Sequence, residues 1–339
     1  MKSYLIMIFI LATLVGCSTL SEPETLPKSI KSFYDHDGTK IHFKDVGKGS
    51  PLVFIHGFGA SMDTWRYMEG TLRAEYRLVF LDLKGHGYSD RPRDGRYSLA
   101  NQAEIVLGLM EHLRLSEAVL VGHSLGSTIA LLVALKAQKI SPDKVSGIVL
   151  LTGSVDPEDL PLFLRLLRFP IFGWLTMKLT TASFRTRLVL KKAFHDDEKV
   201  TDSLVELYSK YQRIPGTDYA LLKTAEQMIP QDASQLRQEL RMLQIPVRNI
   251  AGEHDEIISK ASTEEVCRVL PRCSLVVVEG VGHVPHEEAP QKIVSVLKDF
   301  MAGAIDSPPF PLSRYNSLSQ SMGTGMGSAI RRQILAAAV

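Results

Sequence analysis

The stretch Ala118-Val119-Leu120-Val121-Gly122-His123-Ser124-Leu125-Gly126 decides how this chain folds. Its first four residues are apolar and predict a buried strand, whereas residues 127–138 predict a helix. The pentapeptide between the two has the form G-x-S-x-G, which places a serine on a sharp turn at the end of a strand. We therefore expect Ser124 to stand above the edge of a sheet, at a helix N-terminus whose positive potential favours a developing anion.

Short apolar runs on both sides of this stretch predict the remaining strands. They are almost continuously apolar, as are parallel strands that are buried on both faces. These runs are residues 52–55, 78–81, 147–151, 247–250 and 274–278, and an antiparallel hairpin around Asp37-Gly38 is expected within residues 29–43. Helical patterns follow at residues 100–113, 263–270 and 291–301. The alternation predicts an α/β fold with a doubly wound, mostly parallel sheet.

One segment interrupts the alternation. About 90 residues with helical character only lie between the sixth predicted strand and the seventh. Because catalytic loops of an open α/β sheet lie at the carboxyl ends of its strands, an insertion at this point covers the site as a lid. We place the helical lid at residues 155–240, and the two parts of the core at residues 30–154 and 241–301.

The composition narrows the class of protein. The chain has 339 residues, of which 45% are hydrophobic and 22% charged, so a disordered, collagen-like or coiled-coil protein is excluded. Lys and Arg number 39 against 37 Asp and Glu, and a net charge of +2 does not favour a nucleic-acid partner. The three cysteines lack the spacing of a zinc site or a disulfide framework. No ligand cluster or phosphate loop is evident, so we expect neither a metal nor an organic cofactor.

The first residues predict a targeting segment rather than part of the fold. Lys2 is followed by an apolar run at residues 4–15, which is too short to span a bilayer of about 30 Å. Residues 1–16 therefore have the pattern of a signal peptide. Their end, Leu14-Val15-Gly16-Cys17, resembles the lipobox of bacterial lipoproteins, in which the cysteine becomes lipidated and begins the mature chain. An ordinary secretory signal and an uncleaved anchor are the alternatives.

The lipobox resemblance implies a location for the protein. Cys17 would carry the lipid, and the polar, Pro-rich residues 17–29 would form a tether. The domain would then be anchored to a bacterial membrane and face the periplasm or the cell surface. Ser18 is not the aspartate that is linked to inner-membrane retention in some Gram-negative bacteria, so the outer membrane is slightly favoured.

The C-terminal residues and the two remaining cysteines lead to two further predictions. Residues 302–327 are rich in Ser, Gly, Pro and Met and have no clear period, so we expect a disordered tail at residues 302–339, with a short helix at residues 329–339. In an oxidising compartment Cys267 and Cys273 could pair, but a spacing of six residues leaves this open. The sequence does not indicate an oligomeric state.

Two more polar residues follow predicted strands, at the same edge of the sheet as Ser124. Asp255 comes after the strand at 247–250, and His283 comes after the strand at 274–278. The order Ser…Asp…His is the one found with this type of serine turn. His283 would take the proton of Ser124, and Asp255 would fix the imidazole tautomer and stabilise the imidazolium. A buried, hydrogen-bonding role for His283 is the alternative.

Other residues compete for these roles. Asp156 follows the sixth strand and could serve as the acid in place of Asp255. His254 and His286 are less well placed than His283, and His123 is expected to pack beside the serine rather than act as a base.

A glycine-rich turn predicts the oxyanion hole. His56-Gly57-Phe58-Gly59 directly follows the strand at residues 52–55. The backbone N–H groups of Phe58 and Leu125 would hold the negative oxygen of a tetrahedral intermediate. A simple glycine turn after a strand is the alternative.

Over residues 30–301 the chain resembles the α/β-hydrolase superfamily, in its lid-bearing esterase/lipase-like branch. Asp82-Leu83-Lys84-Gly85-His86-Gly87-Tyr88-Ser89 is similar to the family's D-x-x-G-x-G-x-S turn, which is normally structural. His283-Val284-Pro285-His286-Glu287-Glu288-Ala289-Pro290 is similar to its H-x-P-x-x-E-x-P stretch. Phe58 departs from the HGGG type of oxyanion motif, and Ser124 departs from the aspartate of haloalkane dehalogenases and epoxide hydrolases.

These features predict a serine hydrolase that cleaves a small-molecule carboxylic ester or acyl substrate through an acyl-enzyme. Carbon–carbon cleavage of a dienoic diketone by the same triad stays open, as do thioester, amide and lactone hydrolysis and perhydrolysis. A non-enzymatic ligand sensor on the same fold is the alternative from another class.

The composition of the lid suggests a second partner. Residues 160–195 contain seven Lys or Arg residues and no Asp or Glu, with apolar residues between them. Such a surface suits anionic lipid headgroups, so the lid could face a membrane. An ordinary lid, with its apolar face on the sheet and its cations in water, is the alternative.

Overall fold

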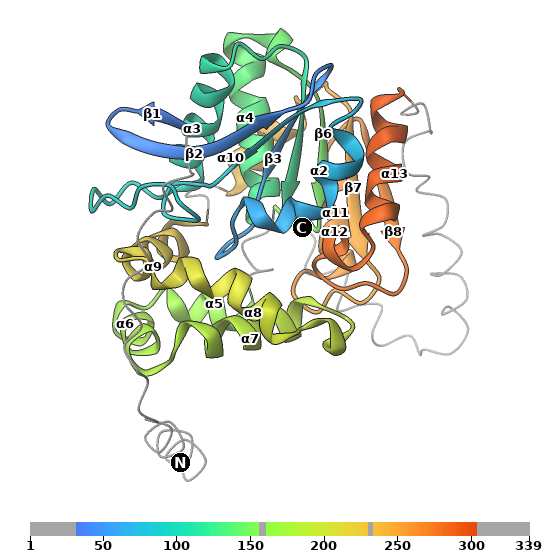
Figure 1. Cartoon of the computed structure of the whole chain (residues 1–339). Helices are drawn as coiled ribbons and strands as arrows, with labels where there is room; N and C mark the ends of the chain where they lie inside the picture. Colours follow the sequence, from blue (N-terminus) through green and yellow to red (C-terminus); the bar gives the residue numbers. More distant parts are fainter. Residues whose placement is uncertain (1–31, 156–160, 230–232, 304–339) are drawn as a thin grey trace, which may run out of the picture.

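A computed structural model describes residues 32–155, 161–229 and 233–303, and Figure 1 shows its architecture. Eight strands form one sheet in the order β1-β2-β4-β3-β5-β6-β7-β8. The strands β3 to β8 run parallel, while β1 and β2 form an antiparallel hairpin whose second strand pairs antiparallel with β4. The strands are β1 (Phe33–His36), β2 (Thr39–Val46), β3 (Pro51–Ile55), β4 (Arg77–Leu81), β5 (Ala118–His123), β6 (Val145–Leu151), β7 (Val247–Gly252) and β8 (Cys273–Val278). The predicted mostly parallel α/β sheet is confirmed.

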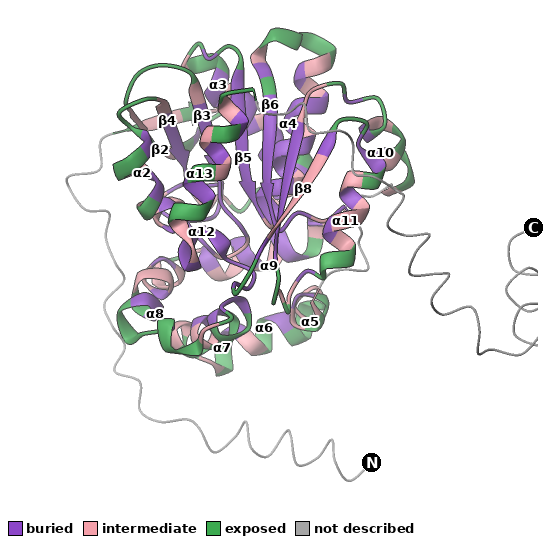
Figure 2. Ribbon diagram, turned by 90° about the vertical axis from the view of Figure 1, so that its right-hand side faces the viewer, coloured by how far each residue is buried: buried purple, intermediate pink, exposed green. Residues whose placement is uncertain are grey.

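Helices cover both faces of the sheet, and alternate residues of each strand supply the two cores. In β3, Val53 and Ile55 belong to the core under α3 (Leu99–His112) and α4 (Leu125–Ile140). Leu52 and Phe54 belong to the core under α2 (Arg66–Leu72) and α13 (Pro290–Met301). Figure 2 shows the central strands buried between these layers. The helices of the core are η1 (Met62–Trp65), α2 (Arg66–Leu72), α3 (Leu99–His112), α4 (Leu125–Ile140), η2 (Pro142–Lys144), α11 (Lys260–Val269), α12 (Pro285–Glu288) and α13 (Pro290–Met301).

Two helices begin at residues other than the predicted ones. Ser98 accepts a hydrogen bond from the Asn101 amide, 3.2 Å away, so α3 begins one residue before the predicted position 100. Helix α4 begins at Leu125 rather than at the predicted position 127, because the turn at Ser124 leads straight into the helix.

The inserted helices follow β6, the sixth strand, as the sequence predicts. They are α5 (Leu162–Leu167), α6 (Pro170–Leu179), α7 (Ala182–Ala193), η4 (Asp197–Lys199), α8 (Asp202–Ser209), η5 (Lys210–Arg213), α9 (Thr217–Gln227) and α10 (Ala233–Leu240). Helices α5 to α9 gather below the sheet in the view of Figure 1. Helix α10 instead contacts α4, and Leu236 and Leu240 join the main core. The cover over the sheet edge is therefore formed by α5 to α9; the helical pattern of residues 233–240 could not show which surface they bury.

Several predicted segments lie outside the described residues. They include the signal peptide at residues 1–16, Cys17 and the tether at residues 17–29, and the tail beyond residue 303. Within the described ranges, the structure contains no helix with the length and hydrophobicity needed to span a membrane.

Cys267 and Cys273 form a disulfide in the structure. The bond joins α11 to the first residue of β8, across the turn that separates them. The sequence left this pairing open, because spacing alone does not fix the distance between two Cβ atoms.

Candidate active site

Ser124 occupies a strained turn between β5 and α4. Its backbone has φ 51° and ψ −116°, a conformation that non-glycine residues rarely adopt. The turn is held by a hydrogen bond of 2.9 Å from the Ser124 amide to the Leu151 carbonyl. A Cβ atom at Gly126 would collide with the backbone of Ile55, and one at Gly122 would collide with Gly126. The two glycines of G-x-S-x-G are therefore required by close backbone approach.

Asp255 and His283 meet at the ends of β7 and β8. The imidazole Nδ1 donates to the Asp255 carboxylate over 2.8 Å, and both side chains are buried. The other carboxylate oxygen accepts the amides of Ile257 and Ile258 over 2.8 and 2.9 Å, which fixes the orientation of Asp255. Because Nδ1 carries the proton of this hydrogen bond, Nε2 of His283 is the basic nitrogen.

His123 links the serine turn to His283. Its Nε2 donates to the His283 carbonyl over 2.9 Å, and the two ring centres are 5.0 Å apart. Burial, followed by the nearby charge of His283, lowers the pKa of His123 to about 3. His123 is therefore neutral near pH 7 and holds the backbone of His283, which agrees with the predicted packing role.

The predicted oxyanion turn lies beside Ser124. A Cβ atom on Gly57 would stand 3.3 Å from the Ser124 Cβ, so this turn and the serine are in direct contact. The buried side chain of His56 holds the turn in place. Its Nδ1 donates to the Gly57 carbonyl over 2.8 Å, and its Nε2 accepts a hydrogen bond from the Leu83 amide over 3.0 Å. Burial lowers the pKa of His56, so the ring keeps the single proton that this arrangement needs.

The competing residues are placed elsewhere. His286 is buried and hydrogen-bonds through Nε2 to the Thr64 hydroxyl over 2.7 Å. His254 stacks on the ring of His195, with ring centres 3.9 Å apart. Asp156 lies outside the described residues. Among the described groups, no cluster of three or more His, Cys, Asp or Glu side chains is arranged to hold a metal ion.

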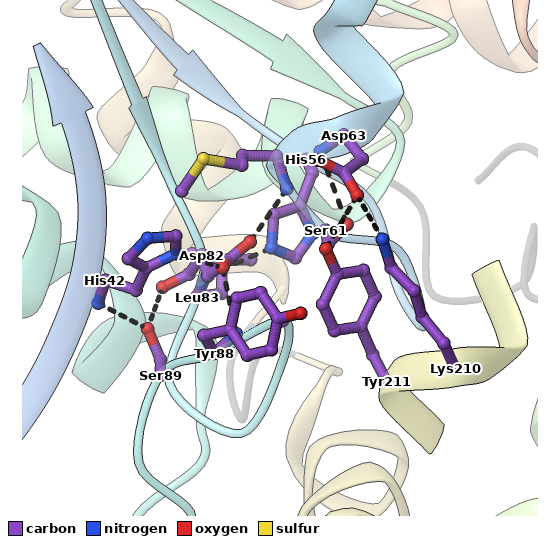
Figure 3. Close-up of polar contacts among 12 residues, drawn as sticks. His42, His56, Ser61, Asp63, Asp82, Leu83, Tyr88, Ser89, Lys210 and Tyr211 are labelled. Atoms are coloured by element: carbon purple, nitrogen blue, oxygen red, sulfur yellow. Dashed lines mark hydrogen bonds and ion pairs between the residues drawn. The ribbon is translucent and has the colours of Figure 1, made fainter. Parts of the chain in front are cut away.

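Asp82, the first residue of the D-x-x-G-x-G-x-S turn, is a buried anchor whose partners the sequence did not indicate (Figure 3). One carboxylate oxygen accepts Nδ1–H of His42 over 2.7 Å and the Tyr88 amide over 2.9 Å, and the other accepts the Met62 amide over 2.8 Å. Burial would raise the pKa of Asp82, but its hydrogen bonds, led by the one from His42, lower it overall. The carboxylate thereby joins β2, the D-x-x-G-x-G-x-S turn and the segment after the oxyanion turn. No local pattern connects His42 to Asp82, since they are 40 residues apart.

The lid is fastened to the segment that follows the oxyanion turn. Asp63 accepts hydrogen bonds from Lys210 Nζ over 3.1 Å and from the Tyr211 hydroxyl over 2.6 Å (Figure 3). The Tyr208 hydroxyl hydrogen-bonds to Thr64 over 2.8 Å, one residue further along. No local sequence pattern indicates these contacts, because they join residues more than 140 positions apart.

The fold and the serine turn define the class of protein, and a comparison with known families agrees. Residues 50–290 match the model of the alpha/beta hydrolase fold. The chain therefore belongs to the alpha/beta hydrolase family.

Curated relatives support a hydrolase, and solved structures share its fold. The hydrolase YugF of Bacillus subtilis is 29% identical over 270 residues, covering 78% of this chain and 95% of the relative. The 2-hydroxymuconate semialdehyde hydrolase of Pseudomonas putida is 28% identical over 274 residues, covering 79% of this chain and 92% of the relative. A meta-cleavage product hydrolase from Pseudomonas fluorescens (TM-score 0.69, 23% identity, 81% and 98% of the two chains) and an esterase from Exiguobacterium antarcticum (0.66, 22%, 78% and 96%) share the fold.

The close contact between Gly87 and Asp82 predicts how much stability a glycine-to-alanine substitution costs in this turn. Gly87 and Gly95 both have positive φ, 50° and 71°, but a Cβ on Gly87 would overlap the Asp82 carboxylate, while a Cβ on Gly95 would meet no atom within 4 Å. Gly95→Ala should therefore cost only backbone strain, about 1 kcal/mol. Gly87→Ala should cost more than about 3 kcal/mol, or leave the chain insoluble. Urea unfolding of the two variants measures the difference, and equal costs would show that Asp82 does not depend on this close approach.

We expect the free energy of unfolding to decrease in acid, because four histidines are buried. Burial is the largest cause that lowers the pKa of His56, His86, His123 and His286, to about 3 for His86 and His123. The unfolded chain binds these protons near pH 6.5 and the folded chain does not. Stability is therefore complete above about pH 6.5 and falls as the pH decreases, by about 1.4 kcal/mol per pH unit for each histidine.

This pH dependence can be measured by urea unfolding between about pH 7 and pH 5. His123→Gln keeps a donor for the His283 carbonyl but removes one titrating ring. Its slope should be smaller than that of the parent by about 1.4 kcal/mol per pH unit. An unchanged slope would mean that His123 is already protonated in the folded protein.

Proposed function

We propose that the protein is a serine hydrolase that cleaves carboxylic esters through an acyl-enzyme. The observation that carries this proposal is the buried Asp255–His283 hydrogen bond of 2.8 Å at the same sheet edge as the strained Ser124 turn. This combination supplies a nucleophile, a base and a group that orients the base, which acyl transfer requires.

In the proposed mechanism, Nε2 of His283 takes the proton of the Ser124 hydroxyl as its oxygen attacks the ester carbonyl. Asp255 keeps the proton on Nδ1 and stabilises the imidazolium that forms. The amides of Phe58 and Leu125 donate to the oxyanion of the tetrahedral intermediate. His283 then protonates the leaving alcohol, and later activates the water that releases the acid from Ser124.

Carbon–carbon bond hydrolysis is the second candidate. Its support is the similarity, over 79% of this chain, to a relative named 2-hydroxymuconate semialdehyde hydrolase. The same serine, base and oxyanion donors could act on a ketone of a dienoic diketone. The lid residues that contact the substrate would decide between the two reactions.

Three variants test the proposed triad. Ser124→Ala, His283→Ala and Asp255→Asn should each lower kcat/KM on p-nitrophenyl esters on the order of ten-thousandfold, because the three residues act as one unit. A fluorophosphonate probe should label the parent chain and not Ser124→Ala. As a matched control, His254→Ala removes an exposed histidine and should leave the rate unchanged.

The outcomes separate the candidate functions. Turnover of a dienoic diketone that depends on Ser124, without ester turnover, would replace ester hydrolysis by carbon–carbon cleavage. An unlabelled chain that turns over neither substrate would favour a ligand sensor on the hydrolase fold.

We further propose that the domain works outside the cytoplasm, anchored by a lipid on Cys17. The Cys267–Cys273 disulfide supports an oxidising compartment, because such bonds persist there and are rare in the cytosol of mesophiles. Cells fed an alkyne fatty acid should incorporate it into the full chain but not into Cys17→Ala. Cys267→Ser is the matched control and should keep the label. Equal labelling of the parent and Cys17→Ala would overturn the lipid anchor.

A further inference from the structure

The lid exposes an unusual amount of apolar side chain. Among the described residues, thirteen large hydrophobic side chains are exposed, and ten of these lie between Leu162 and Val189. Ile171 is 83% exposed and Trp174 is 57% exposed. Such a concentration on one short segment marks an interaction surface, whereas single exposed apolar residues are ordinary.

The exposed residues form stripes along two helices. In α6, Ile171, Trp174 and Leu175 lie on one face together with the exposed Lys178, at the spacing of a helical repeat. In α7, Phe184 and Leu188 share a face with the exposed Lys191. Figures 1 and 2 both place α6 and α7 on the side of the lid that is farthest from the sheet. The stripes therefore face away from the core.

The opposite face of α6 is buried against neighbouring lid helices. Gly173 and Met177 are buried, and α6 packs against α5 and α9. A Cβ atom on Gly173 would approach Leu222 of α9 to 2.6 Å, which shows how closely these helices pack. The apolar stripe is thus not the face that attaches α6 to the protein.

All charged residues of the segment that contains α5, α6 and α7 are basic. Residues 161–193 contain seven Lys or Arg residues and no acidic residue. Lys178, beside the apolar stripe, makes no ion pair within the described ranges, and the pairs of Lys191 and Lys192 with Asp197 and Glu256 are exposed. Exposed pairs are weak, so these cations remain able to meet another anion.

We propose that the face formed by α6 and α7 docks on the surface of an anionic lipid bilayer. Cations on an apolar helix face, with a tryptophan among them, match the interface between lipid headgroups and acyl chains. An acidic protein would complement the charge but would not account for two apolar stripes on neighbouring helices. The docking is independent of the proposed chemistry, so a Ser124→Ala chain should bind vesicles as tightly as the parent.

Tryptophan fluorescence provides a direct test. The chain has two tryptophans, Trp65, which is 1% exposed, and Trp174 on the proposed docking face. The chain from Leu20 onward keeps every described element and lacks the apolar leader and Cys17, so binding by the leader is excluded. Vesicles of phosphatidylcholine and phosphatidylglycerol should shift the emission of Trp174 to shorter wavelength, while pure phosphatidylcholine should not. Trp174→Phe should lose this shift but still sediment with the anionic vesicles.

Matched variants separate the two contributions to binding. Ile171→Ser with Leu175→Ser should weaken vesicle binding at least tenfold, whereas Met242→Ser, which alters a residue that is 66% exposed elsewhere, should not. Lys178→Gln should weaken binding about fivefold, and Lys48→Gln, at an exposed site outside the lid, should have no effect. Urea unfolding midpoints equal to that of the parent would show that the variants are folded.

Three results would overturn the proposal. The first is no sedimentation with anionic vesicles at low salt. The second is equal binding by the parent and the Ile171→Ser, Leu175→Ser variant. The third is self-association of the parent that this variant abolishes without any effect of vesicles, which would assign the face to a second copy of the chain.

Discussion

The backbone turn at Ser124 is the constraint on which the candidate site depends. A serine at φ 51° is tolerated only because the surrounding structure holds it there. The hydrogen bond from its amide to Leu151 connects the turn to β6, and the close approach of Gly126 to Ile55 connects it to β3. Three neighbouring parallel strands thus fix one residue, and the ends of these strands and of β7 and β8 bring the remaining polar groups to the same edge.

His283 is held from three directions, and each has a different physical basis. Asp255 holds the ring through a buried hydrogen bond, and neutral His123 holds the carbonyl from the serine strand. The amide of His283 donates to the carbonyl of Ala193, the last residue of lid helix α7, over 2.6 Å. The position of the proposed base therefore depends on the lid as well as on the sheet. A change in the packing of α7 would therefore shift the backbone of His283, because the two are joined by this hydrogen bond.

Local patterns in the sequence predicted what local geometry determines. The apolar runs predicted every strand of the sheet, and G-x-S-x-G predicted the turn, because both depend on residues close together in the chain. The Asp82–His42 pair and the contacts of Asp63 with the lid were not predicted, since they join residues 40 or more positions apart. Residues 233–240 have a helical period, but the period alone could not show that they pack on α4 rather than over the sheet edge.

The lid buries apolar and polar side chains toward the core and exposes further apolar side chains on its outer side. Toward the core, Leu164, Ala225 and Met228 join the main hydrophobic core. Polar contacts, such as those of Lys210 and Tyr211 with Asp63, fasten it as well. Toward the outside, α6 presents Ile171 and Trp174 to water. The inner side of α6 packs against α5 and α9. In the proposed docking, a bilayer would bury the outer apolar stripe of α6, and the cations around this stripe favour a bilayer with a negatively charged surface.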